Sequence, residues 1–284
     1  MNRRILIGYD GSPDADAALA WALDEATRIG APAELLYGEE WPLWVPGANM
    51  VPLQSTRSES YAEQATRRML DSAVAWARQT HPLVRVTATT ARVHASVALI
   101  ERSRQARLIV IGSRGHSVVA NLFGSVSSAV CAHARCSVAV VRGDARTTAP
   151  VVAGVDGSAL ASPVLIFAAQ QAAERKAPLR VIRTWPPVTG LWESSSLITR
   201  IVTEHEREPF DTLVAAVRDT YPDLDIAGEA TVAHPATALT RAGATAQLLV
   251  VGSRGRGAIR GMFLGSVSQH LLRHAACTVA VVHI

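Results

Sequence analysis

The strongest constraint on the fold is an internal repeat, because residues 108–141 and 248–282 carry one pattern. The first copy reads LIVIGSRGHSVVANLFGSVSSAVCAHARCSVAVV and the second reads LLVVGSRGRGAIRGMFLGSVSQHLLRHAACTVAVV. In each copy an apolar run leads into a glycine-rich loop, then Gly-Ser at the start of a helical pattern, then a second apolar run. A loop between a strand end and a helix start presents free backbone N–H groups, which suit a phosphate. The repeat therefore predicts two similar units with one anion-binding loop each.

The repeat extends over the whole chain. The segment ILIGYDGS near the start contains Asp10, and VVAGVDGS after the midpoint contains Asp156. A polar stretch, GDARTTAP at 143–150, is the natural linker between the halves. A chain of 284 residues has room for two ordinary domains. We predict a first domain over residues 1–146 and a second over residues 147–284.

Short runs rich in Val, Ile and Leu alternate with helical patterns in each half. Apolar residues recur at helical spacing over 13–29 and over 60–79. Strands are expected near 3–9, 33–38, 84–91, 107–112 and 137–142, and near 150–156, 179–184, 224–232, 247–252 and 278–283. Apolar strands that alternate with helices favour parallel sheets covered on both faces. The predicted fold class is α/β, with two tandem open parallel five-stranded sheets of Rossmann-like type.

Sheets of this type bind ligands at the carboxyl ends of their strands, where the winding direction switches. The first expected strand of each half ends at Asp10 or Asp156, and the fourth ends at Gly112 or Gly252. If these strands are neighbours, the aspartate and the glycine loop share one crevice in each half.

These residues resemble the universal stress protein family in its tandem two-domain form. The nucleotide-binding signature of that family is Gly, two residues, Gly, nine residues, and then Gly followed by Ser or Thr. The second half matches it with Gly252, Gly255, Gly265 and Ser266. The first half has Gly112, Gly115, Gly124 and Ser125, but only eight residues separate its second and third glycines. The missing residue leaves open whether the first loop still cradles a phosphate.

The resemblance implies an adenine nucleotide alpha hydrolase-like fold and an ATP site in each half, with magnesium as a candidate companion. In the second half the implied binding residues are Asp156, Gly157, Gly252, Arg254, Gly255, Gly265, Ser266, Val267 and Ser268. In the first half they are Asp10, Gly11, Gly112, Arg114, Gly115, Gly124, Ser125, Val126 and Ser127. The family also has members that bind no ATP. Its last strands commonly pair, so we expect 137–142 and 278–283 to lie edge to edge, and a homodimer of whole chains is a further candidate.

Each of these residues also has a plainer interpretation. Glycines after a strand can be turn residues only, and the two aspartates precede Gly-Ser, so they can form turns. Arg114 and Arg254 can hold phosphate or be solvated loop arginines. We expect Ser125 and Ser266 at helix N-cap positions. His94 and His234 precede helical patterns, and we favour a structural role for both.

Composition excludes several function classes. The formal charge is +4, almost all of the positive charge is arginine, and Lys176 lies far from both glycine loops, which excludes a P-loop motor. Scattered arginines predict no nucleic-acid partner, and no stretch approaches the ~20 apolar residues of a membrane span. The start of the chain runs directly into a strand pattern, so we expect a cytoplasmic protein. Cysteines 131, 136 and 277 have no metal-ligand spacing and are expected to be small buried hydrophobes.

Three functions remain open. The first is an ATP-binding regulatory protein of the stress response, acting on unidentified regulatory proteins. The second is an interaction scaffold with vestigial crevices. The third is a slow ATP hydrolase, and this hypothesis is weaker because no obvious base for phosphoryl transfer is present.

Two loops are aromatic and rich in proline, and they could roof a crevice or form a subunit contact. One contains Trp41, Trp44 and Pro46, and the other contains Trp185, Pro186, Pro187 and Trp192. The run 204–208 is expected to be a solvated helix face.

Overall fold

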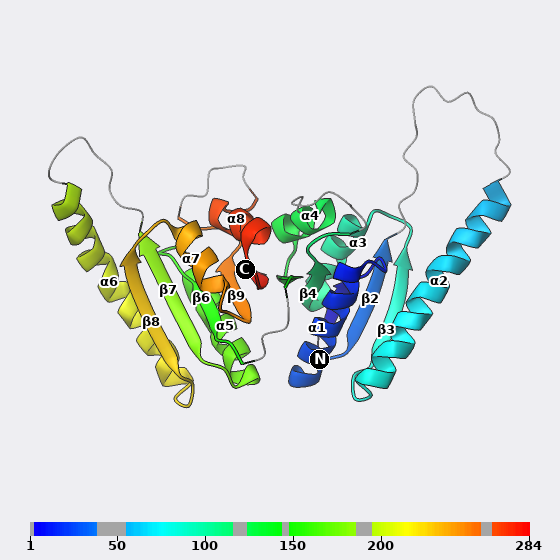
Figure 1. Cartoon of the computed structure of the whole chain (residues 1–284), viewed down its shortest axis with the longest axis horizontal. Coiled ribbons are helices and arrows are strands. Elements are labelled where there is room, and N and C mark those ends of the chain that lie inside the picture. The colour runs from blue at the N-terminus through cyan, green and yellow to red at the C-terminus, as the bar shows by residue number, and fades with distance from the viewer. Residues whose placement is uncertain (1–2, 39–54, 116–123, 144–147, 186–194, 257–262) are drawn as a thin grey trace, which may run out of the picture.

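The computed structural model describes residues 3–38, 55–115, 124–143, 148–185, 195–256 and 263–284. Each half contributes five strands and four α-helices to it (Figure 1). The strands are β1 Arg4–Gly8, β2 Ala33–Gly38, β3 Val86–Ala91, β4 Ala106–Gly112, β5 Ser137–Val141, β6 Val151–Gly154, β7 Leu179–Trp185, β8 Ile226–Val232, β9 Leu248–Gly252 and β10 Thr278–Val282. The helices are α1 Pro13–Ile29, α2 Ser55–Thr80, α3 Ala95–Arg102, α4 Ser125–His133, α5 Ala161–Arg175, α6 Ser195–Thr220, α7 Pro235–Gly243 and α8 Ser266–His274, with a 3-10 turn, η1, at Ser103–Gln105.

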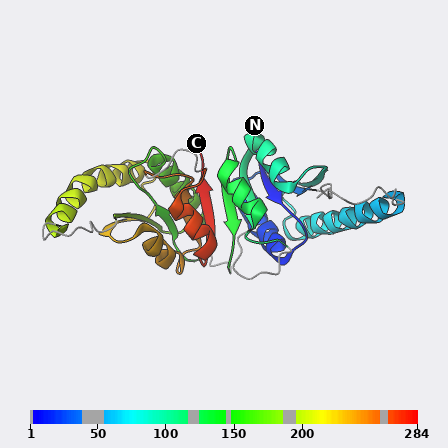
Figure 2. The ribbon, with the colours of Figure 1, turned by 90° about the horizontal axis from the view of Figure 1, so that it is seen from above.

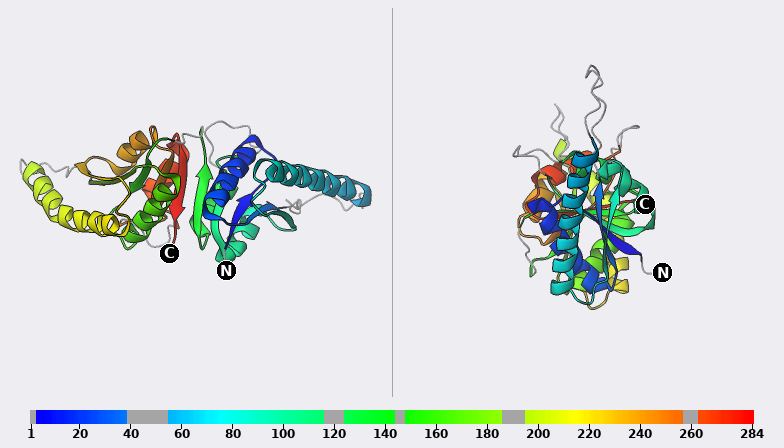
Figure 3. Two further views of the ribbon diagram at one scale, coloured as in Figure 1. Left: turned by 90° about the horizontal axis from the view of Figure 1, so that it is seen from below. Right: turned by 90° about the vertical axis from the view of Figure 1, so that its right-hand side faces the viewer.

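The strands form one ten-stranded sheet in the order β3-β2-β1-β4-β5-β10-β9-β6-β7-β8. Pairing is parallel within each half, as the continuous apolar strands predict. The halves join through β5 and β10, which pair antiparallel with Ala139 opposite Ala280 and lie side by side in the middle of the molecule (Figures 2 and 3). The expected edge-to-edge pairing of the last strands is therefore confirmed, and it covers an apolar strand edge in each half.

The two faces of the sheet are built differently. On one face, α3, α4, α7 and α8 share a single apolar core with β5 and β10, so this core runs across both halves. On the other face, α1 and α2 close a core in the first half, and α5 and α6 close a separate core in the second. The two halves therefore share one apolar core on the first face, whereas on the other face they keep separate cores, which a buried ion pair between Arg175 and Glu25 at 2.8 Å joins.

Local signals explain why α1 occupies its predicted range. The Ser12 hydroxyl caps its start by accepting a bond from the Ala15 N–H, and Pro13 fits the first turn. Gly30 ends the helix with a φ of 61°, which few other residues adopt easily. The second expected helix begins earlier than predicted, at Ser55.

The long helices α2 and α6 have the same length of 26 residues but different shapes. Pro209 lies inside α6 at the place that Met69 occupies in α2. An interior proline removes one helical hydrogen bond and bends the helix. In Figure 2, α6 curves while α2 runs straight.

Several predictions fall outside the described residues. These include the domain boundary at 146, the loop residues Trp41, Trp44 and Pro46, and Pro186, Pro187 and Trp192. Within the described part of the chain, every helix is too short or too polar to cross a membrane.

Candidate functional site

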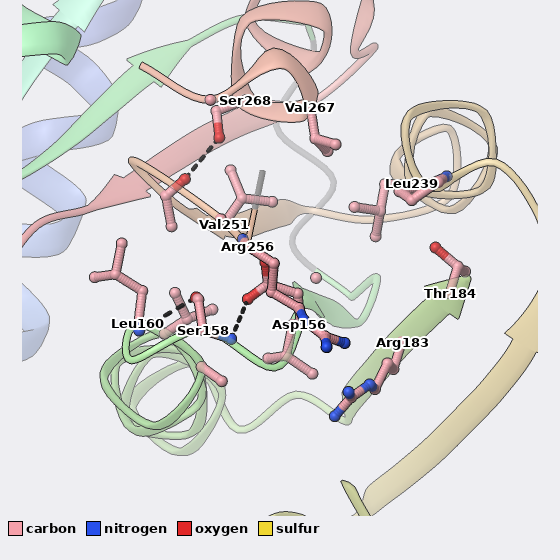
Figure 4. A pocket seen from close by; sticks show the side chains of 18 of the residues that line it. Asp156, Ser158, Leu160, Arg183, Thr184, Leu239, Val251, Arg256, Val267 and Ser268 are labelled. Carbon is pink, nitrogen blue, oxygen red and sulfur yellow. Dashed lines mark hydrogen bonds between the residues drawn. The ribbon is translucent and has the colours of Figure 1, made fainter. Parts of the chain in front are cut away.

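A cavity of about 480 Å³ opens at the carboxyl ends of β6 and β9 in the second half. These strands are neighbours in the sheet, so the expected adjacency of Asp156 and the glycine loop is confirmed. All nine second-half residues predicted from the sequence line this cavity. Figure 4 labels three of them, Asp156, Val267 and Ser268. They meet there although 100 positions of the chain separate Asp156 from Arg256. The Arg256 N–H donates a hydrogen bond to the Asp156 carboxylate and so joins the two segments.

Asp156 organises both loops of the cavity. Its Oδ1 accepts a hydrogen bond from the Ser158 N–H at 2.9 Å, and its Oδ2 accepts one from the Arg256 N–H at 2.9 Å. A Cβ on Gly255 would lie 2.5 Å from the same Oδ2, so a side chain there would displace the carboxylate. Asp156 therefore forms a turn and also ties that turn to the glycine loop.

The N-terminus of α8 faces the cavity with unused donors. The structure corrects the expected capping: Gly265 and Gly124 are the N-cap residues of α8 and α4, while Ser266 and Ser125 are the first helical residues. The glycines can take the cap position because each donates its N–H to a loop carbonyl, Gly265 to Ser253 at 2.8 Å. No described side chain caps α8, so the N–H groups of its first turn remain available for an anion.

The hydroxyl groups of Ser127 and Ser268, in the first turn of each helix, form hydrogen bonds within the protein. The Ser268 hydroxyl donates to the Gly252 carbonyl at 2.6 Å, and Ser127 donates to Gly112 at 2.9 Å. These bonds tie the start of each helix to the end of its strand. Val126 and Val267 are partly buried and pack against the shared core, and Val267 also lines the cavity.

The cavity lining carries more positive than negative charge. Asp156 is the acidic residue among the described lining residues, against Arg183, Arg254 and Arg256. The Arg254 side chain is exposed and makes no hydrogen bond to a described residue. Arg183 is 4% exposed, and its Nη2 would lie 3.2 Å from a Cβ on Gly157. This surplus of positive charge favours an anionic ligand.

Sequence reasoning missed part of the lining. Arg183 and Thr184 come from the end of β7, and His234 and Pro235 from the start of α7. Trp185, a candidate from the sequence to roof a crevice, is the last residue of β7 and also lines the cavity. Arg183 does not stand out in the sequence, because the same strand also carries Arg180. The register of the strands places Tyr37 at the equivalent position in the first half. His234, which we interpreted as structural, lies in the cavity wall, whereas His94 caps α3 through a bond from the Ser96 N–H.

The first crevice has the same frame but different contents. Asp10 Oδ1 accepts from the Ser12 N–H at 3.0 Å, and a Cβ on Gly115 would lie 2.7 Å from Asp10 Oδ2. Asp14, from the first turn of α1, then reaches the glycine loop. Its Oδ2 accepts bonds from the Ser113 hydroxyl at 2.8 Å and the Arg114 N–H at 2.9 Å.

Asp14 therefore puts a carboxylate of the protein on the loop that is predicted to receive phosphate. The Arg114 guanidinium also turns to Asp14, at 3.5 Å. The corresponding residue in the second half is Leu160, which packs beside Gly252 as Asp14 packs beside Gly112. At the other end of this crevice, the Met69 sulfur would lie 2.5 Å from a Cβ on Gly11, so Met69 covers the turn that follows Asp10.

The expected burial of the cysteines is confirmed for two of them, whereas Cys136 is only partly buried. Cys131 and Cys277 are buried, and burial raises the pKa of the Cys131 and Cys136 thiols, the latter to about 12. No disulfide joins any two of the three cysteines. Residues 204–208 lie in α6 with Arg207 and Glu208 exposed, and the described residues hold no group of three metal-ligating side chains.

Comparison with known proteins agrees with the fold and the repeat. The universal stress protein family matches residues 1–142 and again residues 148–283. A universal stress protein of Mycolicibacterium smegmatis is 32% identical over 98% of this chain and 96% of its own length. A universal stress protein of Mycobacterium tuberculosis is 30% identical over the same shares. The crystal structure of a universal stress protein from Archaeoglobus fulgidus superposes with a TM-score of 0.67 at 18% identity, covering 99% of this chain and 98% of that one. The chain therefore belongs to the universal stress protein family, with two copies of the family domain in tandem.

Proposed function

We propose that this protein is a nucleotide-binding regulatory protein of the stress response and that ATP binds in the cavity of the second half. The observation that carries the proposal is the convergence of Asp156, the glycine loop and the free N-terminus of α8 on one cavity. Its volume of about 480 Å³ lies within the roughly 300–1,000 Å³ usual for small-molecule sites.

Each part of the cavity suits one part of ATP. The triphosphate would accept hydrogen bonds from the main chain of the glycine loop and of Ser266, with Arg254 as a charged partner. The adenosine would lie toward Asp156, Gly157 and the end of β7, where apolar lining from Ala161 and Val164 is also present. Any magnesium would take its ligands from phosphate oxygens and water, because the described side chains offer no acidic cluster to hold it.

The same reasoning limits the first half. Asp14 already satisfies the Arg114 N–H, and its negative charge repels a phosphate. Met69 covers the turn at Gly11. We therefore propose one nucleotide per chain, with the first half acting as an interaction module that the second half regulates.

Calorimetric titration of the whole chain with ATP tests the proposal. We expect saturation at one nucleotide per chain with a dissociation constant in the micromolar range, about −8 kcal/mol. Absence of heat, together with absence of co-purified nucleotide, would overturn it. Phosphate release well above background that is lost on substitution of Gly255 would instead favour a slow hydrolase.

A further inference from the structure

We propose that Arg142, a residue of the first half, positions the nucleotide pocket of the second half by holding the far end of α8. This inference rests on the proposed function, because it concerns the same pocket. It differs from that function in assigning a role to a residue outside the pocket and in the other half of the chain.

Arg142 follows β5 and reaches across to the other half. Its Nη1 donates to the Arg273 carbonyl at 2.6 Å and lies 3.5 Å from the Ala275 carbonyl. These carbonyls lie at the C-terminal end of α8, where backbone acceptors lack intrahelical donors and positive charge is favourable. Arg142 therefore caps a helix that belongs to the opposite half.

The next residue shows that this contact is built into the backbone. Gly143 has a φ of +70°, a conformation that favours glycine. A Cβ at Gly143 would overlap the carbonyl oxygen of Ala276. Two consecutive residues of the first half are thus fitted to the segment that follows α8.

Helix α8 is short and anchored at both ends. At its start, Ser268 bonds the Gly252 carbonyl at the end of β9, beside the cavity. In its middle, Leu271 and Leu272 are 0% and 2% exposed in the core that both halves share. A helix of nine residues held in this way is short enough for a displacement at one end to reach the other. Release of its C-terminal end would therefore shift the N–H groups that its N-terminal end offers to phosphate, and hydrogen bonds weaken steeply with such misalignment.

Arg142 also lies near the glycine loop of its own half. Burial lowers the pKa of its guanidinium, Arg114 lowers it further, and Asp14 raises it. Figure 1 shows α4 and α8 next to each other at the junction of the halves, above the β5–β10 pair. Arg142 therefore lies between the glycine loop of the first half, which Asp14 contacts, and α8 beside the cavity of the second half.

The test compares Arg142→Met, Arg142→Gln and Arg142→Lys with a matched control. Arg107→Met removes another arginine that faces across the halves, 3.8 Å from Glu174, without touching α8. We expect Arg142→Met and Arg142→Gln to weaken ATP binding about threefold to tenfold by calorimetry. They should also accelerate amide hydrogen exchange in α8. Arg142→Lys, which keeps the charge and a donor, should restore most of the affinity, and Arg107→Met should bind as the unmodified chain does.

The outcomes separate the two proposals. If the unmodified chain binds no ATP, the proposed function and the role of Arg142 both fall. If the unmodified chain binds ATP and both Arg142→Met and Arg142→Gln bind it equally well, with unchanged exchange in α8, only the positioning role is overturned. An affinity loss of the same size in Arg107→Met would also overturn it, since the effect would then belong to the junction as a whole.

Discussion

The two crevices of this molecule share a frame and differ in what fills it. Asp10 and Asp156 hold their turns in the same way, and Ser127 and Ser268 tie helix to strand at the same place. In the first crevice, however, Asp14 accepts bonds from the Ser113 hydroxyl and the Arg114 N–H, whereas its counterpart in the second, Leu160, has no side-chain acceptor. The fold therefore preserves the shape of a phosphate loop even where the protein supplies its own anion.

The adenosine end of the two crevices differs as well. Met69 covers Gly11, while Gly157 has Arg183 and Arg256 as its nearest neighbours. The cause lies in the long helices, because α6 carries Pro209 where α2 carries Met69. A bent helix without a side chain of that length leaves room beside the turn. Asp14 against Leu160 and Met69 against Pro209 are thus two of the differences between the crevices that the described residues show.

The largest expected effect comes from adding a methyl group to the glycine loop of the second half, with the same change in the first loop as its control. Gly255→Ala should lower ATP affinity about 100-fold, because the new Cβ displaces the Asp156 carboxylate and misplaces loop donors worth roughly 3 kcal/mol together. Gly115→Ala makes the same change beside Asp10 in the first loop and should leave the titration unchanged. Equal losses in the two variants, measured by calorimetry, would show that both crevices bind.

Opening the first crevice is the converse experiment. Asp14→Leu installs the residue of the second half, frees the Arg114 N–H and removes a charge, so affinity there should rise about tenfold or more. The titration should then approach two nucleotides per chain, with the new site weaker because Met69 remains in place. Asp16→Leu is the control. The Asp16 carboxylate comes from the same helical turn, but it accepts a hydrogen bond from the Tyr9 hydroxyl and none from the described part of the glycine loop. A stoichiometry that stays at one in Asp14→Leu would contradict the role given to Asp14.

The paired arginines of the loops should differ by a smaller factor. Arg254→Gln should weaken ATP binding about tenfold, the loss of one exposed charge-assisted contact. Arg114→Gln should change nothing, because Arg114 already faces Asp14. Raising the salt concentration should narrow the gap between Arg254→Gln and the unmodified chain, since exposed charges are screened. A gap that is independent of salt would argue against a phosphate contact.

Much of this arrangement could be predicted from the sequence, because the residues that determine it lie close together in the chain. Helix α1 has its cap, proline and terminal glycine within the chain segment itself, and its predicted range matches the structure. The glycine loops and the pairing of β5 with β10 follow from the repeat and from the family resemblance. The apolar periodicity and the duplicated glycine spacing can be recognised in the sequence without knowledge of the tertiary contacts.

The difference between the crevices could not be predicted in the same way. Asp14 is an ordinary acidic residue in a first helical turn, and only the fold brings it to Ser113 and Arg114. The shortened first loop was the visible signal, but residues 116–123 lie outside the described part of the chain. A position-by-position comparison of the halves would have helped, since it sets Asp14 against Leu160 and Tyr37 against Arg183.

The smallest expected effect concerns two of the hydrogen bonds that cross between the halves. Arg142 of the first half caps α8, whereas His283 of the second half donates from Nε2 to the Cys131 carbonyl in α4 at 2.9 Å. Burial lowers the pKa of His283, and nearby Arg254 lowers it further, while Nδ1 is buried without a hydrogen-bond partner among the described residues. A histidine that resists protonation when folded contributes its full stability above its ordinary pKa of about 6.5 and loses it as the pH falls through the lower folded value. His283→Gln should therefore flatten the decline of the free energy of unfolding between about pH 7 and pH 5, measured by urea denaturation, whereas the same change at exposed His274 should not. If the free energy of unfolding of His283→Gln follows that of the unmodified chain at every pH, protonation of His283 does not cause the loss of stability in acid.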